Sequence, residues 1–176
     1  MNDVQIELEL TYLAATMPEE VKGATPRRIL DVMIPEGVAH PHLRLRQKGK
    51  KYEITKKQPV IDGDASKQTE ITIPLEKVEF EALIPASQLR VVKDRYNVHI
   101  DGFPAEVDVF RGKLEGLVLI DFEFNTERAK ADFRMPQVAL ADVTQEDFIA
   151  GGMLAGKSYD DISSDLARFN YKKLSS

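Results

Sequence analysis

The segment Ile6-Glu-Leu-Glu-Leu-Thr-Tyr12 alternates apolar and polar residues with a period of two. Because successive side chains of a β-strand point to opposite faces, this pattern predicts a half-buried strand with an acidic polar face. The segment His42-Leu-Arg-Leu-Arg-Gln-Lys48 repeats the alternation, but its polar face is basic. The chain therefore contains predicted strands whose polar faces carry charges of opposite sign.

Further strands follow from the same pattern. Lys48-Gly-Lys-Lys51 has turn composition, so residues 52–57 are expected to return as the second arm of a hairpin. Other strands are expected at residues 28–34, 67–73, 89–100, 105–110 and 117–124. Helical spacing is found at residues 74–83, 144–154 and 159–169, with Ser158 as an N-cap and a short turn at residues 18–21. We predict a single α+β domain over residues 1–176, built on a large antiparallel sheet.

The composition limits the class of protein. The 176 residues include 43% apolar and 30% charged residues, which is typical of a globular protein. The absence of cysteine excludes disulfides and thiolate metal sites. The sequence also shows no signal-peptide pattern and no apolar run long enough to span a membrane. Together these features favour a cytoplasmic protein without a membrane partner. A net charge of −5 argues against nucleic acid as a partner.

The charged side chains are sorted by strand into pairs at i, i+2 spacing, so each pair lies on one face of its strand. For a single pair, a solvated sheet face is the simpler interpretation. Taken together, the pairs favour a closed or strongly curved sheet that directs both signs of charge into one cavity. The acidic pairs are Glu7 with Glu9, Glu106 with Asp108, and Asp121 with Glu123; the basic residues are Arg44, Arg46, Lys57, Lys93 and Arg95.

Such a cavity has a definite chemistry. Carboxylates bind hard cations such as Mg²⁺ or Mn²⁺, and arginine forks and lysine ammonium groups bind phosphate oxygens. Because carboxylates and a polyphosphate repel each other, a divalent metal is needed to bridge them. The pattern predicts phosphoryl or nucleotidyl chemistry on a small phosphate-containing substrate.

Several segments, in order, resemble the motifs of the CYTH family, the triphosphate tunnel metalloenzymes. These are Ile6-Glu-Leu-Glu-Leu-Thr11, Leu43-Arg-Leu-Arg46, Ile54-Thr-Lys-Lys57, Lys93-Asp-Arg-Tyr96, Glu106-Val-Asp-Val-Phe110 and Ile120-Asp-Phe-Glu-Phe124. The resemblance implies an eight-stranded antiparallel closed barrel, the triphosphate tunnel, with peripheral and C-terminal helices. It also implies hydrolysis of inorganic triphosphate or an organic triphosphate with Mg²⁺ or Mn²⁺. A monomer and a homodimer both stay open.

The resemblance also assigns roles to residues. It implies metal ligands at Glu7, Glu9, Asp108, Asp121 and Glu123, with Glu106 nearby. It implies phosphate binding by Arg44, Arg46, Lys57, Lys93 and Arg95. Among these residues, Glu7, Glu9 and Lys57 are the expected catalytic groups.

Four positions in three motifs depart from the family pattern. Thr11 replaces the lysine of the N-terminal signature, Gln68 and Thr72 replace a basic and an acidic residue around Glu70, and Asp121 replaces a glutamate. Two alternatives to a triphosphatase therefore stay open. One is an adenylate cyclase that makes cyclic AMP from ATP, and the other is a non-catalytic module that binds polyphosphate or nucleotides.

Three other features invite a functional interpretation. Gly151-Gly-Met-Leu-Ala-Gly-Lys-Ser158 matches the P-loop pattern, but a helical segment precedes it where a buried strand is required, so we expect a turn between helices. His40 and His42 flank Pro41 and lack a third metal ligand nearby, which favours loop histidines. His99 continues the polar face of Lys93, which leaves open whether it lines the tunnel or faces solvent.

Overall fold

The structure is a computed structural model that describes residues 4–175. The predicted strands are all present in this part of the chain, and a ninth strand joins them. They are β1 (Gln5–Ala14), β2 (Arg27–Ile34), β3 (Leu43–Lys48), β4 (Lys51–Pro59), β5 (Lys67–Leu75), β6 (Arg90–Ile100), β7 (Phe103–Phe110), β8 (Val118–Phe124) and β9 (Ala139–Asp142).

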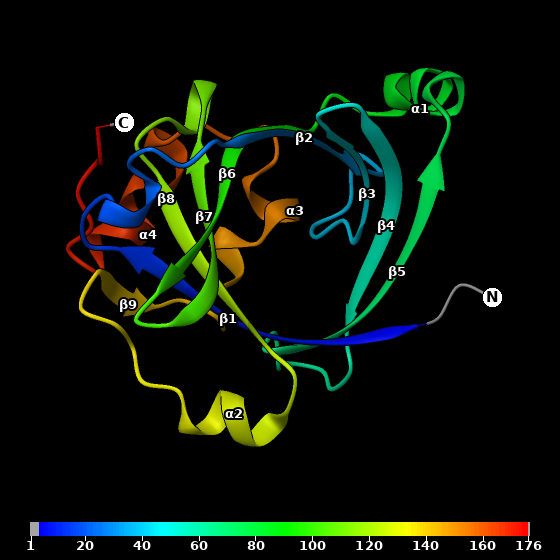
Figure 1. The fold of residues 1–176 in the computed structure, drawn as a ribbon. Helices are drawn as coiled ribbons and strands as arrows, with labels where there is room; N and C mark the ends of the chain where they lie inside the picture. Colours follow the sequence, from blue (N-terminus) through cyan, green and yellow to red (C-terminus); the bar gives the residue numbers. More distant parts are fainter. Residues whose placement is uncertain (1–3, 176) are drawn as a thin grey trace.

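Eight of these strands form a closed antiparallel barrel, as the sequence predicts. The strand order is β5-β4-β3-β2-β6-β7-β8-β1, and β1 returns to pair with β5. This closing pair runs from Gln5↔Glu70 to Leu8↔Lys67. Figure 1 shows the strands as a ring around a central space. Because side chains alternate along each strand, closure directs one face of every strand into the ring.

Strand β9 was not predicted. It pairs with the C-terminal half of β1, from Tyr12↔Asp142 to Ala14↔Ala139. This edge of β1 is free there because the pairing with β5 ends at Leu8. Four residues are too few to show a clear alternation, so only the free edge of β1 determines that β9 forms.

The helix expected at residues 74–83 is shorter than predicted. Pro74 belongs to β5, and helix α1 spans Lys77–Leu83. The strand tolerates Pro74 because β5 pairs with β1 only up to Glu70, so its far end is an edge. At the start of α1, the Glu79 carboxylate accepts a hydrogen bond from the Glu76 backbone N–H at 2.7 Å.

The two predicted C-terminal helices are broken into short pieces. The first contains the 3₁₀ helix η4 (Asp147–Ile149) and α3 (Gly151–Leu154), separated by the extended residue Ala150. The second contains η5 (Asp160–Ile162) and α4 (Ser163–Ala167), and Ser158 accepts a hydrogen bond from the Asp161 N–H at 3.4 Å, as expected of a cap. The remaining helices are η1 (Glu19–Val21), as predicted, and η2 (Ile84–Ala86), η3 (Gly112–Leu114) and α2 (Glu127–Asp132), which were not.

These C-terminal pieces are short because they fill one end of the barrel. Leu13, Phe110 and Leu119 lie on the same strand faces as the charged residues and form an apolar cluster with Leu154 and Ile162. The cluster replaces the polar interior with a packed core at that end. In Figure 1, α3 lies within the ring of strands. Burial against the barrel, rather than helical periodicity, sets the length of each piece.

In the part of the chain that the structure describes, no helix is long and apolar enough to cross a membrane.

Candidate active site

The barrel encloses a cavity of about 660 Å³. The structure brings together in its lining every residue that the sequence predicts for metal or phosphate binding. These are Glu7, Glu9, Arg44, Arg46, Lys57, Lys93, Arg95, Asp108, Asp121 and Glu123, together with Glu106. Strand alternation explains this convergence, because the two residues of each i, i+2 pair face the same side of the sheet.

Three carboxylates form a compact acidic cluster. Glu7 and Glu9 on β1 and Glu123 on β8 each offer an oxygen, and these oxygens all lie within 4.8 Å of one another. Burial raises the pKa of Glu7, and Glu9 and Glu70 add to the effect. Burial and the neighbouring Glu106, Glu7 and Glu9 raise the pKa of Glu123 to about 7. A set of oxygen donors that repel one another suits a hard divalent cation.

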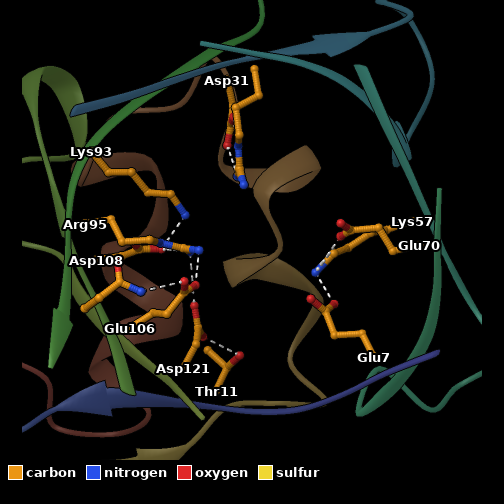
Figure 2. A network of polar contacts seen from close by, with 12 residues as sticks. Glu7, Thr11, Asp31, Lys57, Glu70, Lys93, Arg95, Glu106, Asp108 and Asp121 are labelled. Carbon is orange, nitrogen blue, oxygen red and sulfur yellow. Dashed lines mark hydrogen bonds and ion pairs between the residues drawn. The ribbon is translucent and has the colours of Figure 1, made fainter. Parts of the chain in front are cut away.

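Lys57 lies between the acidic cluster and the basic side of the cavity. Its ammonium donates a hydrogen bond to Glu7 and lies 3.4 Å from Glu70 Oε2 (Figure 2). Burial lowers the pKa of Lys57, but the carboxylates of Glu9 and Glu7 outweigh this and raise it. Lys57 is therefore held in its charged form beside the acidic cluster.

Asp108 lines the cavity but faces cations rather than the acidic cluster. It accepts a hydrogen bond from Lys93 and two from Arg95, at 2.7 and 2.6 Å. Burial alone would raise the pKa of Asp108, but Arg95 and Lys93 hold it below its usual range. Its carboxylate is thus saturated by cations, so Asp108 stays only a predicted metal ligand.

Asp121 also lies outside the acidic cluster. Its carboxylate is 3.6 Å from Arg95 Nη2 and accepts a hydrogen bond from the Thr11 hydroxyl at 2.8 Å. Burial raises the pKa of Asp121 well above its usual value, and the charges of Glu9 and Asp108 add to this. Its environment favours the neutral acid in the metal-free protein.

The two arginines of β3 differ in how they are held. Arg46 forms a double hydrogen bond with Asp31, at 2.7 and 2.8 Å. Arg44 lies 3.7 Å from Glu70, and its buried Nε has no hydrogen-bond partner among residues 4–175. Burial and the adjacent Arg46 lower the pKa of Arg44. A buried donor without an acceptor is costly, and an anionic oxygen in the cavity would satisfy it. Arg44 therefore fits a phosphate ligand.

The departures from the family pattern also face the cavity. Gln68 donates a hydrogen bond to the Ala65 carbonyl at 3.0 Å. Thr72 donates to Glu70 at 3.1 Å and lies 2.8 Å from the Thr55 hydroxyl. These side chains are therefore bonded to neighbouring protein groups inside the tunnel.

Asp31 is a buried, charged cavity residue that the sequence pattern did not predict. It lies on β2, and its side chain is 7% exposed. The available signal was a single acidic residue within the apolar run Ile29-Leu-Asp-Val-Met-Ile34. A buried charge is tolerated only where a partner of opposite charge bonds it. The partner of Asp31 is Arg46 on the neighbouring strand β3, and this pairing is visible only in the tertiary structure.

The P-loop interpretation does not fit the structure. Gly151 begins α3, whereas a P-loop requires its glycines between a strand and a helix. Gly156, with φ +82°, forms the turn after the helix. Ser158 donates its hydroxyl to Asp161 at 2.8 Å and so belongs to the start of the next helical turn. The segment is a turn between short helices, as expected.

The histidines lie at different places. His40 and His42 both line the cavity, with ring centroids 4.5 Å apart. Within residues 4–175, neither belongs to a group of three metal-ligating side chains. His99 is exposed and lies outside the cavity lining, so it faces solvent and does not line the tunnel.

Comparisons with known proteins agree with this geometry. The CYTH domain model matches residues 39–149. An inorganic triphosphatase from Nitrosomonas europaea is 37% identical over 142 residues, which cover 80% of this chain and 90% of that protein. A solved structure of an inorganic triphosphatase has a TM-score of 0.62 at 29% identity, covering 88% of this chain and 97% of that one. A putative adenylate cyclase from Bacillus halodurans shares the fold at a TM-score of 0.55 and 17% identity, covering 93% of this chain and 98% of that one. The barrel, its charged lining and these similarities show that the chain belongs to the CYTH domain family.

Proposed function

We propose that this protein is a divalent-metal-dependent triphosphatase that hydrolyses inorganic triphosphate inside the tunnel. The observation that carries the proposal is the acidic cluster of Glu7, Glu9 and Glu123, which shares one cavity with a basic wall. The basic wall consists of Arg44, Arg46, Lys57, Lys93 and Arg95. Similarity to an inorganic triphosphatase supports this substrate over an organic triphosphate.

The acidic cluster would hold Mg²⁺ or Mn²⁺. Its carboxylates supply oxygen ligands only, and burial together with the neighbouring carboxylates raises the pKa of Glu7 and of Glu123, a cost of ionisation that a cation would offset. When bound, the metal would supply Lewis-acid polarisation of a phosphoryl oxygen and bridge the carboxylates to the substrate.

The basic wall would bind the phosphate chain and offset the charge that spreads over the equatorial oxygens in the transition state. A guanidinium has five N–H donors, so Arg95 retains donors for phosphate after it bonds Asp108 and Glu106. Arg44 supplies the buried Nε that lacks an acceptor. Lys57 would place its ammonium where the metal-binding carboxylates meet the phosphates, since it already contacts Glu7.

The test is phosphate release from tripolyphosphate with Mg²⁺ or Mn²⁺. We expect the double variant Glu7→Gln/Glu9→Gln to lose on the order of 100-fold or more in turnover, because the cation loses two of its ligands. The matched control is Glu19→Gln/Glu20→Gln, which removes two carboxylates from the exposed helix η1. Release by the wild type that does not exceed release by the Glu7→Gln/Glu9→Gln variant would contradict the proposal.

Thr11 motivates a second candidate, a tunnel that binds triphosphate without hydrolysing it. Here a neutral hydroxyl bonded to Asp121 stands where the family signature has a lysine. This candidate predicts tight binding of tripolyphosphate by calorimetry, lost in Arg44→Ala/Arg46→Ala, with no phosphate release. The same assay run with ATP separates the cyclase alternative, because cyclic AMP and pyrophosphate are resolved from ADP and phosphate by chromatography.

A further inference from the structure

Asp31 and Arg46 form a planar, two-point ion pair in the wall of the tunnel. Arg46 Nε lies 2.7 Å from Asp31 Oδ1, and Nη2 lies 2.8 Å from Oδ2. The two residues are register partners on β2 and β3, and their side chains are 7% and 6% exposed. In Figure 2, Asp31 lies on the opposite side of the view from Thr11 and Asp121. Asp31 thus fixes the guanidinium through two bonds.

The presence of Asp31 is unexpected in a cavity that binds anions. Its carboxylate faces the same space as Arg44 and Lys93, so it would weaken the binding of a polyphosphate in the ground state. Arg44, on the same face of β3, shows that an arginine can occupy this wall without such a pair. The side-chain hydrogen bonds of Asp31 go to Arg46, so we look for its contribution in what it does to that guanidinium.

We propose that Asp31 is a positioning residue that fixes the Arg46 guanidinium so that its remaining N–H donors face the reacting phosphate. The inference rests on the proposed function. Two of the five donors bond Asp31, and the other three are free to bind phosphate oxygens. Fixing the fork in advance removes the entropic cost of ordering a long side chain during the reaction. Without the pair, Arg46 would be buried next to the like charge of Arg95.

The proposal predicts a characteristic kinetic change in Asp31→Asn, which keeps the shape of the side chain and removes its charge. We expect kcat for tripolyphosphate to fall at least about tenfold, because a misaligned donor no longer meets the charge that develops in the transition state. KM should fall, because the cavity gains net positive charge and binds the polyphosphate more tightly in the ground state. A purely structural role would instead reduce the folded fraction, which lowers apparent kcat and cannot lower KM.

The chain offers a matched control in Asp94. This residue of β6 is 6% exposed, accepts hydrogen bonds from Arg28 and Arg111, and does not line the tunnel. Asp94→Asn should lower the thermal midpoint and leave kcat and KM within about twofold of wild type. Equal kinetic losses in the two variants would show that Asp31 acts only on stability and would overturn the proposal.

A double-mutant cycle tests whether Asp31 acts through Arg46. In the Arg46→Gln background, Asp31→Asn should change kcat by less than about twofold. The double variant replaces the ion pair with a neutral amide pair, so it leaves no unpaired buried charge and can be measured even if Asp31→Asn alone does not fold. Multiplicative losses would overturn the inference. If the wild type binds tripolyphosphate but does not hydrolyse it, the proposed function fails, and the same non-additivity must then be found in the dissociation constant. An absence of binding would contradict both.

Discussion

The hydroxyl of Thr11 on β1 donates a hydrogen bond to Oδ1 of Asp121 on β8, 2.8 Å away, inside the tunnel. The two residues are register partners in the barrel. Burial and the charges of Glu9 and Asp108 raise the pKa of Asp121, and a neutral hydroxyl does little to reverse this. A lysine at position 11 would place an ammonium beside the same carboxyl group. Thr11 therefore contacts Asp121 without supplying the positive charge that a lysine would bring to this part of the cavity.

Thr11→Lys should raise turnover of tripolyphosphate on the order of tenfold, because it adds a cation to the phosphate-binding cavity and lowers the pKa of Asp121. Phosphate release under saturating metal measures the effect. Thr11→Met, which has similar length and no charge, is the control and should not raise turnover. Adding Gln68→Arg should increase the gain. Unchanged turnover with tighter binding in the double variant would show that these departures do not limit the reaction.

The acidic cluster should make stability depend on pH in the metal-free protein. The pKa of Glu123 is raised to about 7 in the folded state, from an ordinary value of 4.5. Between these values the folded state binds more protons than the unfolded state, so the free energy of unfolding falls as pH rises from 4.5 to 7. Urea unfolding in the presence of a metal chelator measures this free energy for wild type and for Glu123→Gln. The difference between the two proteins isolates the contribution of Glu123, because both contain the same other titrating groups.

Mg²⁺ should reverse this trend. Because the cation binds the deprotonated carboxylates, its stabilising effect should be larger at pH 8 than at pH 5.5 in the wild type and much smaller in Glu123→Gln. The assignment of Glu123 to the cluster would be contradicted if the free energy of unfolding had the same pH dependence in wild type and variant, both with and without Mg²⁺.

Lys57→Ala and Lys157→Ala should differ sharply. Lys57 contacts Glu7 and Glu70 in the cavity, whereas Lys157 follows α3 outside the cavity lining. We expect Lys57→Ala to lose on the order of 100-fold in turnover, because an electrostatic donor is removed from a buried site. Lys157→Ala should stay within about twofold. A large loss in Lys157→Ala would revive the P-loop interpretation.

Arg44→Met should stabilise the ligand-free protein and weaken its binding of tripolyphosphate. Arg44 is buried, its Nε has no partner among residues 4–175, and the nearby Arg46 repels it. Removing it should raise the free energy of unfolding by about 1 kcal/mol in the absence of ligand. The dissociation constant for tripolyphosphate, measured by calorimetry, should rise at least tenfold. A variant that binds as tightly as wild type would exclude Arg44 from the phosphate site.

Most of the barrel could be predicted from the sequence because strand periodicity is local. Alternation in segments such as residues 6–12 identifies both the strand and the face that its charges share. Strand β9 and the broken C-terminal helices could not be predicted in this way. The first depends on a free edge of β1, and the second on burial of Leu154 and Ile162 in the end of the barrel.

The sequence by itself determined which charged residues of a strand share one face, because side chains alternate along the strand, and the pairs it identified all line the cavity. Only the tertiary structure decided which charges meet. Closure and register bring Glu123 to Glu7 and Glu9, while Asp108 is bonded by Lys93 and Arg95. They also bring Asp31 to Arg46, although 15 positions separate the two in the chain. Ion pairing depends on distances of a few ångströms between strands, and those distances are set by how the whole barrel closes.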